Sequence, residues 1–207
     1  MDQHVKPPGT LRERQKEQTR ELIIDALLQA MASGEYEGMS HDALAKKVGV
    51  SRQTVYRYFP DREALLQALW AKITASAGPG VGMPHSQQDF LDRLHDTYVG
   101  FDQIADVMTV ALSTPQGRAM RQSMKSVRQD TYRSILQHAV ADLPERDQVL
   151  ATSVLQLLSA GYAWLEMRSQ WDMTGEEIAV ACRWAAETLL ADLQRRKGKP
   201  LAAEETR

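Results

Sequence analysis

Apolar residues recur every three or four positions along almost the whole chain, which is the period of an amphipathic α-helix. The clearest stripe is Leu22, Ile23, Ala26, Leu27 and Ala30. Alternation of apolar and polar residues, the pattern of a half-buried strand, does not extend over a useful length anywhere. The pattern therefore predicts an all-α protein.

Helix start and stop residues divide this pattern into nine predicted helices. Serine, threonine or aspartate stands where several helices begin, proline stands twice at a first helical position, and glycine follows helix ends. The predicted helices cover residues 12–33, 40–48, 51–59, 61–77, 86–101, 102–112, 114–141, 144–169 and 174–196.

The segment 78–84 holds three glycines and two prolines, so it cannot be helical and indicates a joint between two parts. A length of 207 residues is compatible with one or two domains. The expected organisation is a flexible arm over 1–11, a first domain over 12–60, a connecting helix over 61–77, a second domain over 86–196 and a disordered tail over 197–207.

Charge changes this picture in one place. The chain as a whole has a net charge of −2 and an ordinary globular composition, with 43% apolar and 25% charged residues. The segment 46–62 carries five basic residues and one acid, a net charge of +4, which leaves −6 for the rest of the chain. A short basic segment on an otherwise acidic protein favours a partner with phosphates.

Several classes of protein are disfavoured. The single cysteine, Cys182, excludes an intramolecular disulfide and a Cys-based zinc site. No apolar run is long enough for a membrane span, and residues 1–14 lack the apolar stretch of a secretion signal, so a cytoplasmic protein is expected. The five histidines do not fall at metal-ligand spacing, so we expect no metal and no cofactor. No nucleophile or phosphate-loop motif indicates an enzyme, although a helical enzyme with scattered catalytic residues stays open as a less favoured alternative.

The stretch over residues 40–62, SHDALAKKVGVSRQTVYRYFPDR, has the form of a helix-turn-helix. Two short helices are separated by Gly49, which permits the positive φ of a sharp turn, and by Ser51, a good N-cap. Ala45 is small, so the two helices can approach closely. Leu44, Val48, Val55 and Phe59 can point inward to a small three-helix core.

The outer face of the second of these helices carries the candidate chemistry. Arg52 and Gln53 lie in its first turn, and these side chains form paired hydrogen bonds with guanine and adenine in the major groove of DNA. Tyrosines suit phosphate or thymine-methyl contacts, and helix starts favour phosphates. The candidate DNA-binding residues are Ser40, Ser51, Arg52, Gln53, Thr54, Tyr56, Arg57, Tyr58 and Arg62. The alternative is a three-helix bundle with a solvated basic face.

The same residues resemble the TetR (tetracycline-repressor) family of bacterial transcription regulators. The matching run is Leu44-Ala45-Lys46-Lys47-Val48-Gly49-Val50-Ser51, then Thr54-Val55-Tyr56-Arg57-Tyr58-Phe59, then Asp61-Arg62-Glu63-Ala64-Leu65-Leu66. The resemblance is specific over residues 14–73, about a third of the chain. Arginine at position 62, where the family most often has lysine, keeps the charge. Gln53 stands where many members have glycine or alanine, so no known operator can be transferred.

The resemblance implies an all-helical homodimer whose first three helices bind a double-stranded operator. The remaining helices would hold a pocket for a small-molecule effector, and the last two would form the dimer interface. Ser40 and Arg62 would be the phosphate clamps. The implied function is a regulator, most simply a repressor that a small molecule releases from a palindromic operator. A helical small-molecule-binding or scaffold protein that does not bind an operator is the alternative.

Two sets of residues in the second domain are candidates for these further roles. Bulky side chains that can line an adaptable apolar pocket predict the ligand-binding residues, although most such residues only pack. These candidates are Tyr98, Phe101, Trp164, Met167 and Trp171. Two helical stripes can build a two-fold interface. They are Leu150, Val154, Leu157, Leu158 and Gly161, and Ile178, Ala181, Cys182, Ala185, Thr188 and Leu189.

Overall fold

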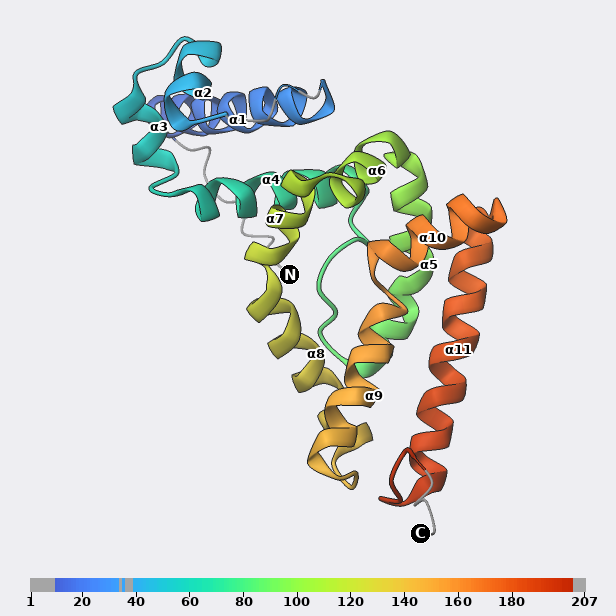
Figure 1. The fold of residues 1–207 in the computed structure, drawn as a ribbon. Coiled ribbons are helices and arrows are strands. Elements are labelled where there is room, and N and C mark those ends of the chain that lie inside the picture. Colours follow the sequence, from blue (N-terminus) through green and yellow to red (C-terminus); the bar gives the residue numbers. More distant parts are fainter. Residues whose placement is uncertain (1–9, 34, 36–38, 203–207) are drawn as a thin grey trace, which may run out of the picture. The chain divides into compact units, whose positions relative to one another are not determined.

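The computed structural model describes residues 10–33, 35 and 39–202, and every regular element within those residues is an α-helix (Figure 1). The all-α prediction is therefore confirmed. The helices are α1 (Leu11–Ala32), α2 (His41–Val48), α3 (Arg52–Tyr58), α4 (Arg62–Ser76), α5 (Gln87–Gln103), α6 (Ala105–Ser113), α7 (Pro115–Ser123), α8 (Lys125–Val140), α9 (Glu145–Leu157), α10 (Gly161–Trp171) and α11 (Gly175–Arg196). None of the helices described is long and apolar enough to cross a bilayer.

The chain forms two compact units, residues 1–70 and 71–207, and the division falls inside α4. In the first unit α1 begins with a capping box, in which Thr10 and Glu13 satisfy each other's backbone N–H groups. Apolar side chains from α1, α2 and α3 meet in one core, each no more than 2% exposed. They are Ile23, Leu27, Leu44, Val55 and Phe59.

In the second unit α11 lies alongside α5 (Figure 1), and these two helices contact each other more extensively than any other two helices among the described residues. Phe90 and Leu94 of α5 and Ile178 and Cys182 of α11 are buried in this packing. The first turn of α11 comes so close that a Cβ on Gly175 would collide with the backbone of α5. Ile178 and Cys182, assigned from sequence to a dimer face, therefore belong to the core of their own chain.

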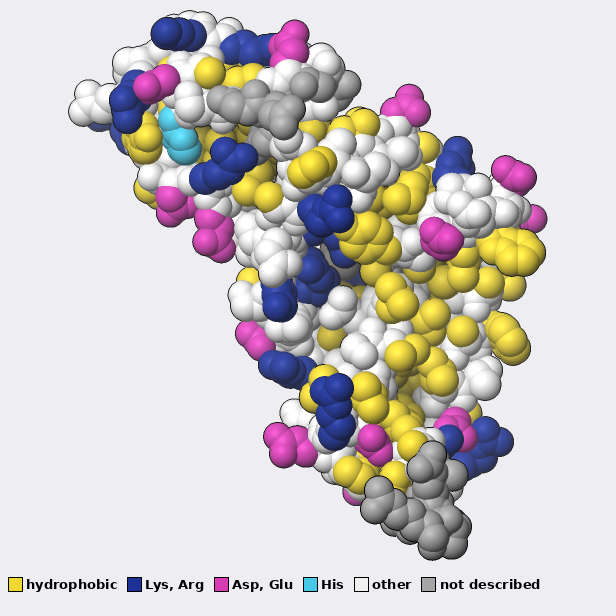
Figure 2. All heavy atoms as spheres, in the orientation of Figure 1, with side chains coloured by type: hydrophobic (Ala, Val, Ile, Leu, Met, Phe, Trp, Pro, Cys, Tyr) yellow, Lys and Arg dark blue, Asp and Glu magenta, His cyan; other side chains and the backbone are white. Residues whose placement is uncertain are grey.

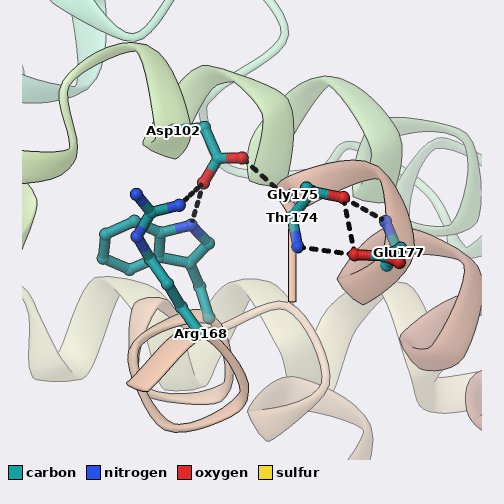
Figure 3. Close-up of polar contacts among 6 residues, drawn as sticks. Asp102, Arg168, Thr174, Gly175 and Glu177 are labelled. Atoms are coloured by element: carbon teal, nitrogen blue, oxygen red, sulfur yellow. Dashed lines mark hydrogen bonds and ion pairs between the residues drawn. The ribbon is translucent and has the colours of Figure 1, made fainter. Parts of the chain in front are cut away.

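Asp102, near the end of α5, ties three helices together (Figure 3). Its Oδ1 accepts hydrogen bonds from Trp164 Nε1 at 2.8 Å and from Arg168 Nη1 at 3.0 Å, both on α10. Its Oδ2 accepts the backbone N–H of Gly175 at 2.6 Å, the first residue of α11. One carboxylate thus fixes where α10 runs and where α11 starts.

The described part of the chain forms eleven helices where nine were expected, because two predicted helices are each divided in two. The helix expected over 114–141 stops at Ser123, where the Arg128 guanidinium donates to the Arg121 carbonyl at 3.1 Å and closes α7. The helix expected over 144–169 is interrupted at Ala160, which is extended. Beside it the Ser159 hydroxyl is hydrogen-bonded to the hydroxyl of Tyr132, 27 residues away.

The two ends of the chain differ in what the structure describes. Residues 1–9 of the expected arm and 203–207 of the expected tail lie outside the described residues. Residues 197–202 of the expected tail are described and make hydrogen bonds with their surroundings. The backbone N–H of Leu201 donates to Asp147 at 2.8 Å, and Arg196 donates to the carbonyl of Pro200 at 2.9 Å. These bonds hold the segment after α11 against the start of α9.

We predict that Asp102→Ala destabilises the protein by about 2–4 kcal/mol, because the buried indole N–H of Trp164 loses its acceptor and α11 loses an N-terminal contact. Urea unfolding at fixed protein concentration measures this. Asp130→Ala is the matched control, since Asp130 is exposed and its ion pair to Arg133, at 3.8 Å, is long and exposed to solvent. This variant should change the free energy of unfolding by less than about 0.5 kcal/mol. Equal effects from the two variants would contradict the role of Asp102.

Candidate nucleic-acid interface

The turn between α2 and α3 has the geometry that the sequence predicted. Gly49 is left-handed, with φ 76° and ψ 28°, and its N–H bonds to the end of α2. The Val50 N–H returns to the Ala45 carbonyl at 3.0 Å. Ser51 then caps α3 by accepting the N–H of Thr54 at 3.1 Å. These contacts set the angle at which α3 leaves α2.

The start of α2 is held against the end of α3. Ser40 caps α2 by accepting the N–H of Ala43 at 3.2 Å. The next residue, His41, stacks on the ring of Tyr56 with centroids 4.4 Å apart, and its Nε2 donates to the carbonyl of Phe59 at 3.1 Å. Tyr56 is thereby fixed in place on the outer side of α3.

Arg52 is held in a fixed position although it is exposed. Its Nε lies 3.0 Å from Asp42 Oδ1 and its Nη1 lies 3.2 Å from Asp42 Oδ2, so the carboxylate engages the guanidinium side-on. The guanidinium carbon is also 5.3 Å from the centre of the Tyr56 ring. A hydrogen bond to Tyr56 and the charge of Asp42 raise the pKa of Arg52. This arginine presents a permanent, pre-positioned positive charge.

The remaining predicted residues lie on or beside the same face. Gln53 and Arg57 are exposed on α3, whereas Thr54 and Tyr58 are half-buried. The Arg57 guanidinium lies over the Tyr58 ring at 5.2 Å. Arg62 is exposed in the first turn of α4, after Asp61 has capped that helix by accepting the N–H of Ala64 at 2.7 Å.

Three further residues of this region were not predicted from the sequence. Asp42 and His41 position Arg52 and Tyr56, and no sequence signal indicates this because it depends on the angle between α2 and α3.

A groove of about 630 Å³ between α1 and α3 is lined by basic side chains of both helices. Arg12 of α1 lies on it with Arg57. Its lining is Thr10, Arg12, Glu13, Gln15, Lys16, Thr19, Arg57 and Tyr58. The spacing of Arg12 and Lys16, four residues apart on one helix, is a signal that could have found this groove.

The predicted ligand-binding residues divide between two environments in the second unit. Tyr98, Phe101 and Trp164 are buried and pack edge to face, with ring centroids 6.1 and 6.0 Å apart. Burial raises the pKa of Tyr98, whose hydroxyl donates to the Leu158 carbonyl at 2.6 Å. Met167 is half-buried and Trp171 is exposed, so these two residues are not part of the same packed cluster. Among the described residues no three His, Cys, Asp or Glu side chains gather as metal ligands.

Residues 23–69, which include the C-terminal part of α1, all of α2 and α3 and the first half of α4, match the sequence profile described as "Bacterial regulatory proteins, tetR family". These residues form a TetR-family N-terminal domain. This TetR-family match covers the helix-turn-helix and its supporting helices and ends before the second unit begins. No curated protein sequence matches the chain.

Two solved structures resemble the chain over most of its length. One is a tetR-family transcriptional regulator from Streptomyces coelicolor, with 21% identity, a TM-score of 0.52, and 86% of this chain and 89% of that chain covered. The other is NalD from Pseudomonas aeruginosa, described as the secondary repressor of a multidrug efflux pump. It has 16% identity, a TM-score of 0.54, and covers 91% of this chain and 100% of its own. At these identities the likeness shows the shared fold alone.

We predict that Gly49→Ala destabilises the protein by about 1–2 kcal/mol, because alanine is strained at a positive φ. The loss is conformational rather than steric, since no atom lies within 4 Å of the position that the new Cβ would take. Urea unfolding measures it. Gly82→Ala is the matched control, because Gly82 does not have positive φ and an added Cβ would make an ordinary contact there. A loss as large at Gly82 would show that the strain at Gly49 is not the cause.

Proposed function

We propose that this protein is a DNA-binding transcriptional regulator whose helix α3 reads base edges in the major groove. The observation that carries the proposal is the capped α3 with Arg52, Gln53 and Arg57 exposed on one face. An α-helix fits the major groove, where each base pair presents a distinct pattern of donors and acceptors. The fixed guanidinium of Arg52 suits a bidentate contact with guanine, and Gln53 suits adenine.

The residues around α3 suit contacts with the phosphate backbone. Ser40 and Arg62 stand at the starts of α2 and α4, where helix N-termini favour anions. Tyr56 and Tyr58 offer hydroxyl groups beside the basic face. The basic groove between α1 and α3 adds Arg12 as a further phosphate contact on the side of α1. These contacts would fix the register, while Arg52 and Gln53 would supply the sequence preference.

We predict that Arg52→Ala weakens binding to the preferred DNA by about 1–3 kcal/mol, or roughly 5- to 150-fold, and relaxes preference at one base pair. The preferred sequence is first selected from a random DNA library with the wild-type protein, and competition gel retardation then measures affinity. Arg62→Ala should instead weaken all sequences alike and reduce the slope of log K against log salt by about 0.9.

Arg133→Ala is the control for both substitutions, because Arg133 is an exposed arginine on α8 in the second unit. It should leave DNA affinity unchanged. Equal loss on every sequence with Arg52→Ala would make Arg52 a phosphate contact and remove it from base reading. Absence of any selected sequence would overturn the proposed function.

We further propose that the protein acts as a two-fold homodimer through α9 and α11. Apolar side chains gather over α9, α10 and α11 on the face drawn in Figure 2. Val180 and Trp184 of α11 are each 71% exposed, one helical turn apart. On α9 the stripe Leu150, Val154 and Leu157 is 40% to 51% exposed. A second copy would bury these side chains, and a two-fold dimer reads a palindrome with half-sites about 10 bp, or a multiple, apart.

We predict that Trp184→Glu shifts the dimer toward monomer, because a charge would be buried at the centre of the interface. Sedimentation velocity at micromolar protein measures the shift. Val127→Glu is the control. Val127, like Trp184, is an exposed apolar residue, with 47% of its surface accessible, but it lies on α8, outside the proposed interface. A monomeric wild type, or a dimer equally sensitive to both changes, would rule out the α9–α11 interface.

We also propose that the protein represses transcription while it is bound to its operator and that a small molecule bound in the second unit releases it from the DNA. The fold is shared with NalD, which is described as a repressor, and this supports a repressor here. An effector in the second unit would have to bind the DNA-free state more tightly than the DNA-bound state, and DNA would then weaken effector binding by the same factor. Tyr98, Phe101 and Trp164 stay the predicted apolar contacts of that effector, whereas Met167 and Trp171 lie outside their packed cluster. The protein would act in the cytoplasm, where its DNA lies.

A further inference from the structure

The carboxylate of Asp42 stands in basic surroundings, because it is the single acid among residues 40–60. The same segment carries four lysines and arginines, which are Lys46, Lys47, Arg52 and Arg57. A negative charge near phosphates weakens binding to DNA, so Asp42 works against the phosphate contacts proposed above unless it meets a donor on the duplex. Its side chain is 49% exposed and is therefore accessible to such a donor.

Contacts of the neighbouring residue hold Asp42 beside the first turn of α3. His41, which comes before it at the start of α2, stacks on the ring of Tyr56 with centroids 4.4 Å apart. His41 Nε2 also donates to the carbonyl of Phe59, the C-cap of α3, at 3.1 Å. Two contacts with α3 therefore fix the start of α2, and with it the place of Asp42.

Asp42 and Arg52 form a pair in which each group can take a further partner. Arg52 Nη1 donates to Asp42 Oδ2 at 3.2 Å, and Arg52 Nε lies 3.0 Å from Asp42 Oδ1. A guanidinium has five N–H groups and a carboxylate has about four acceptor positions, so this pairing exhausts neither group. The pair therefore presents a donor on Arg52 and an acceptor on Asp42 side by side.

The spacing within this pair matches that of neighbouring bases in B-DNA. Successive bases of one strand are about 3.4 Å apart along the helix axis, and the two contacts between Asp42 and Arg52 are 3.0 and 3.2 Å long. In the major groove cytosine and adenine present an amino group, whereas guanine and thymine present acceptors. When Arg52 contacts a guanine, the carboxylate of Asp42 stands at the level of the next base, where an amino group is the donor that suits it.

We propose that Asp42 is a specificity-determining residue, which accepts a hydrogen bond from the amino group of cytosine or adenine next to the guanine that Arg52 contacts. This inference rests on the proposed DNA-binding function and deepens it. One ion pair then reads two neighbouring bases, a guanine through its donor and an amino-bearing base through its acceptor. A guanine or thymine in the place of the amino-bearing base sets two acceptors against each other, which weakens binding.

The first test uses the full-length wild-type protein and the DNA that it selects from a random library. The guanine read by Arg52 is the position at which Arg52→Ala loses its preference. The amino-bearing base beside it is then replaced by an analogue that lacks the amino group, pyrimidin-2-one for cytosine or purine for adenine. We expect about tenfold weaker binding in competition gel retardation, because one donor to Asp42 is lost.

The second test uses Asp42→Asn, which keeps the shape of the side chain but carries a donor as well as an acceptor. We expect the sequence that this variant selects to lose the preference for cytosine or adenine over guanine or thymine at that position. Removing the amino group from the DNA should then weaken its binding less than about twofold, since groups in direct contact are energetically coupled. The first test needs no variant and stays decisive if Asp42→Asn does not fold.

Glu63→Gln is the matched control, because Glu63 is an exposed acid in the first turn of α4 and the change in charge is the same. It should keep the base preference of the wild type at every position. The inference is overturned if the wild type prefers no amino-bearing base on either side of the guanine, or binds equally well without the amino group. An unchanged preference in Asp42→Asn also overturns it. In each of these outcomes the wild type still selects a sequence, so the proposed DNA-binding function stands, whereas absence of any selected sequence overturns both.

Discussion

The second unit is organised around the carboxylate of Asp102. Its two oxygens collect N–H groups from an indole, a guanidinium and the first backbone amide of α11, which come from positions 62, 66 and 73 residues further along the chain. Because α11 starts at this carboxylate and lies along α5, its rotation about its own axis is fixed. That rotation puts Ile178 and Cys182 inside and leaves Val180 and Trp184 outside. The exposed apolar face of α11 is thus a consequence of the contacts of one half-buried carboxylate.

The first unit depends instead on short-range contacts. Gly49 and the two serine caps set the path of the chain, and all of their bonds join residues no more than five positions apart. The ring of His41 then carries this local geometry across to Tyr56 on α3. A seven-residue helix would be unstable alone, so the caps and the core around Phe59 are what keep it helical. The two units therefore reach order by different means.

This difference explains how much the sequence could predict. The boundaries of α2 and α3 follow from Ser40, Gly49 and Ser51, because a cap acts on residues near it in the chain. Neither Met124 nor Ala160, where the two long predicted helices are interrupted, is a glycine or a proline. These interruptions depend on contacts with Arg128 and with Tyr132, so the apolar periodicity alone predicted an unbroken helix at each place. Which faces of α11 are buried could not be predicted either, since the stripe of small residues fits both sides. The exposed face of α3 was predictable, whereas its support by Asp42 was not.

The clamp of Asp42 on Arg52 has a consequence for how quickly and how selectively α3 would engage a duplex. A free arginine samples many rotamers, and freezing it on association lowers affinity. Here that ordering has already taken place during folding, so less conformational entropy is lost at the moment of contact. The same carboxylate repels any acceptor-rich surface that does not seat the guanidinium well. If α3 reads DNA as proposed, preorganisation and repulsion together would sharpen discrimination between a matching site and the rest of a chromosome.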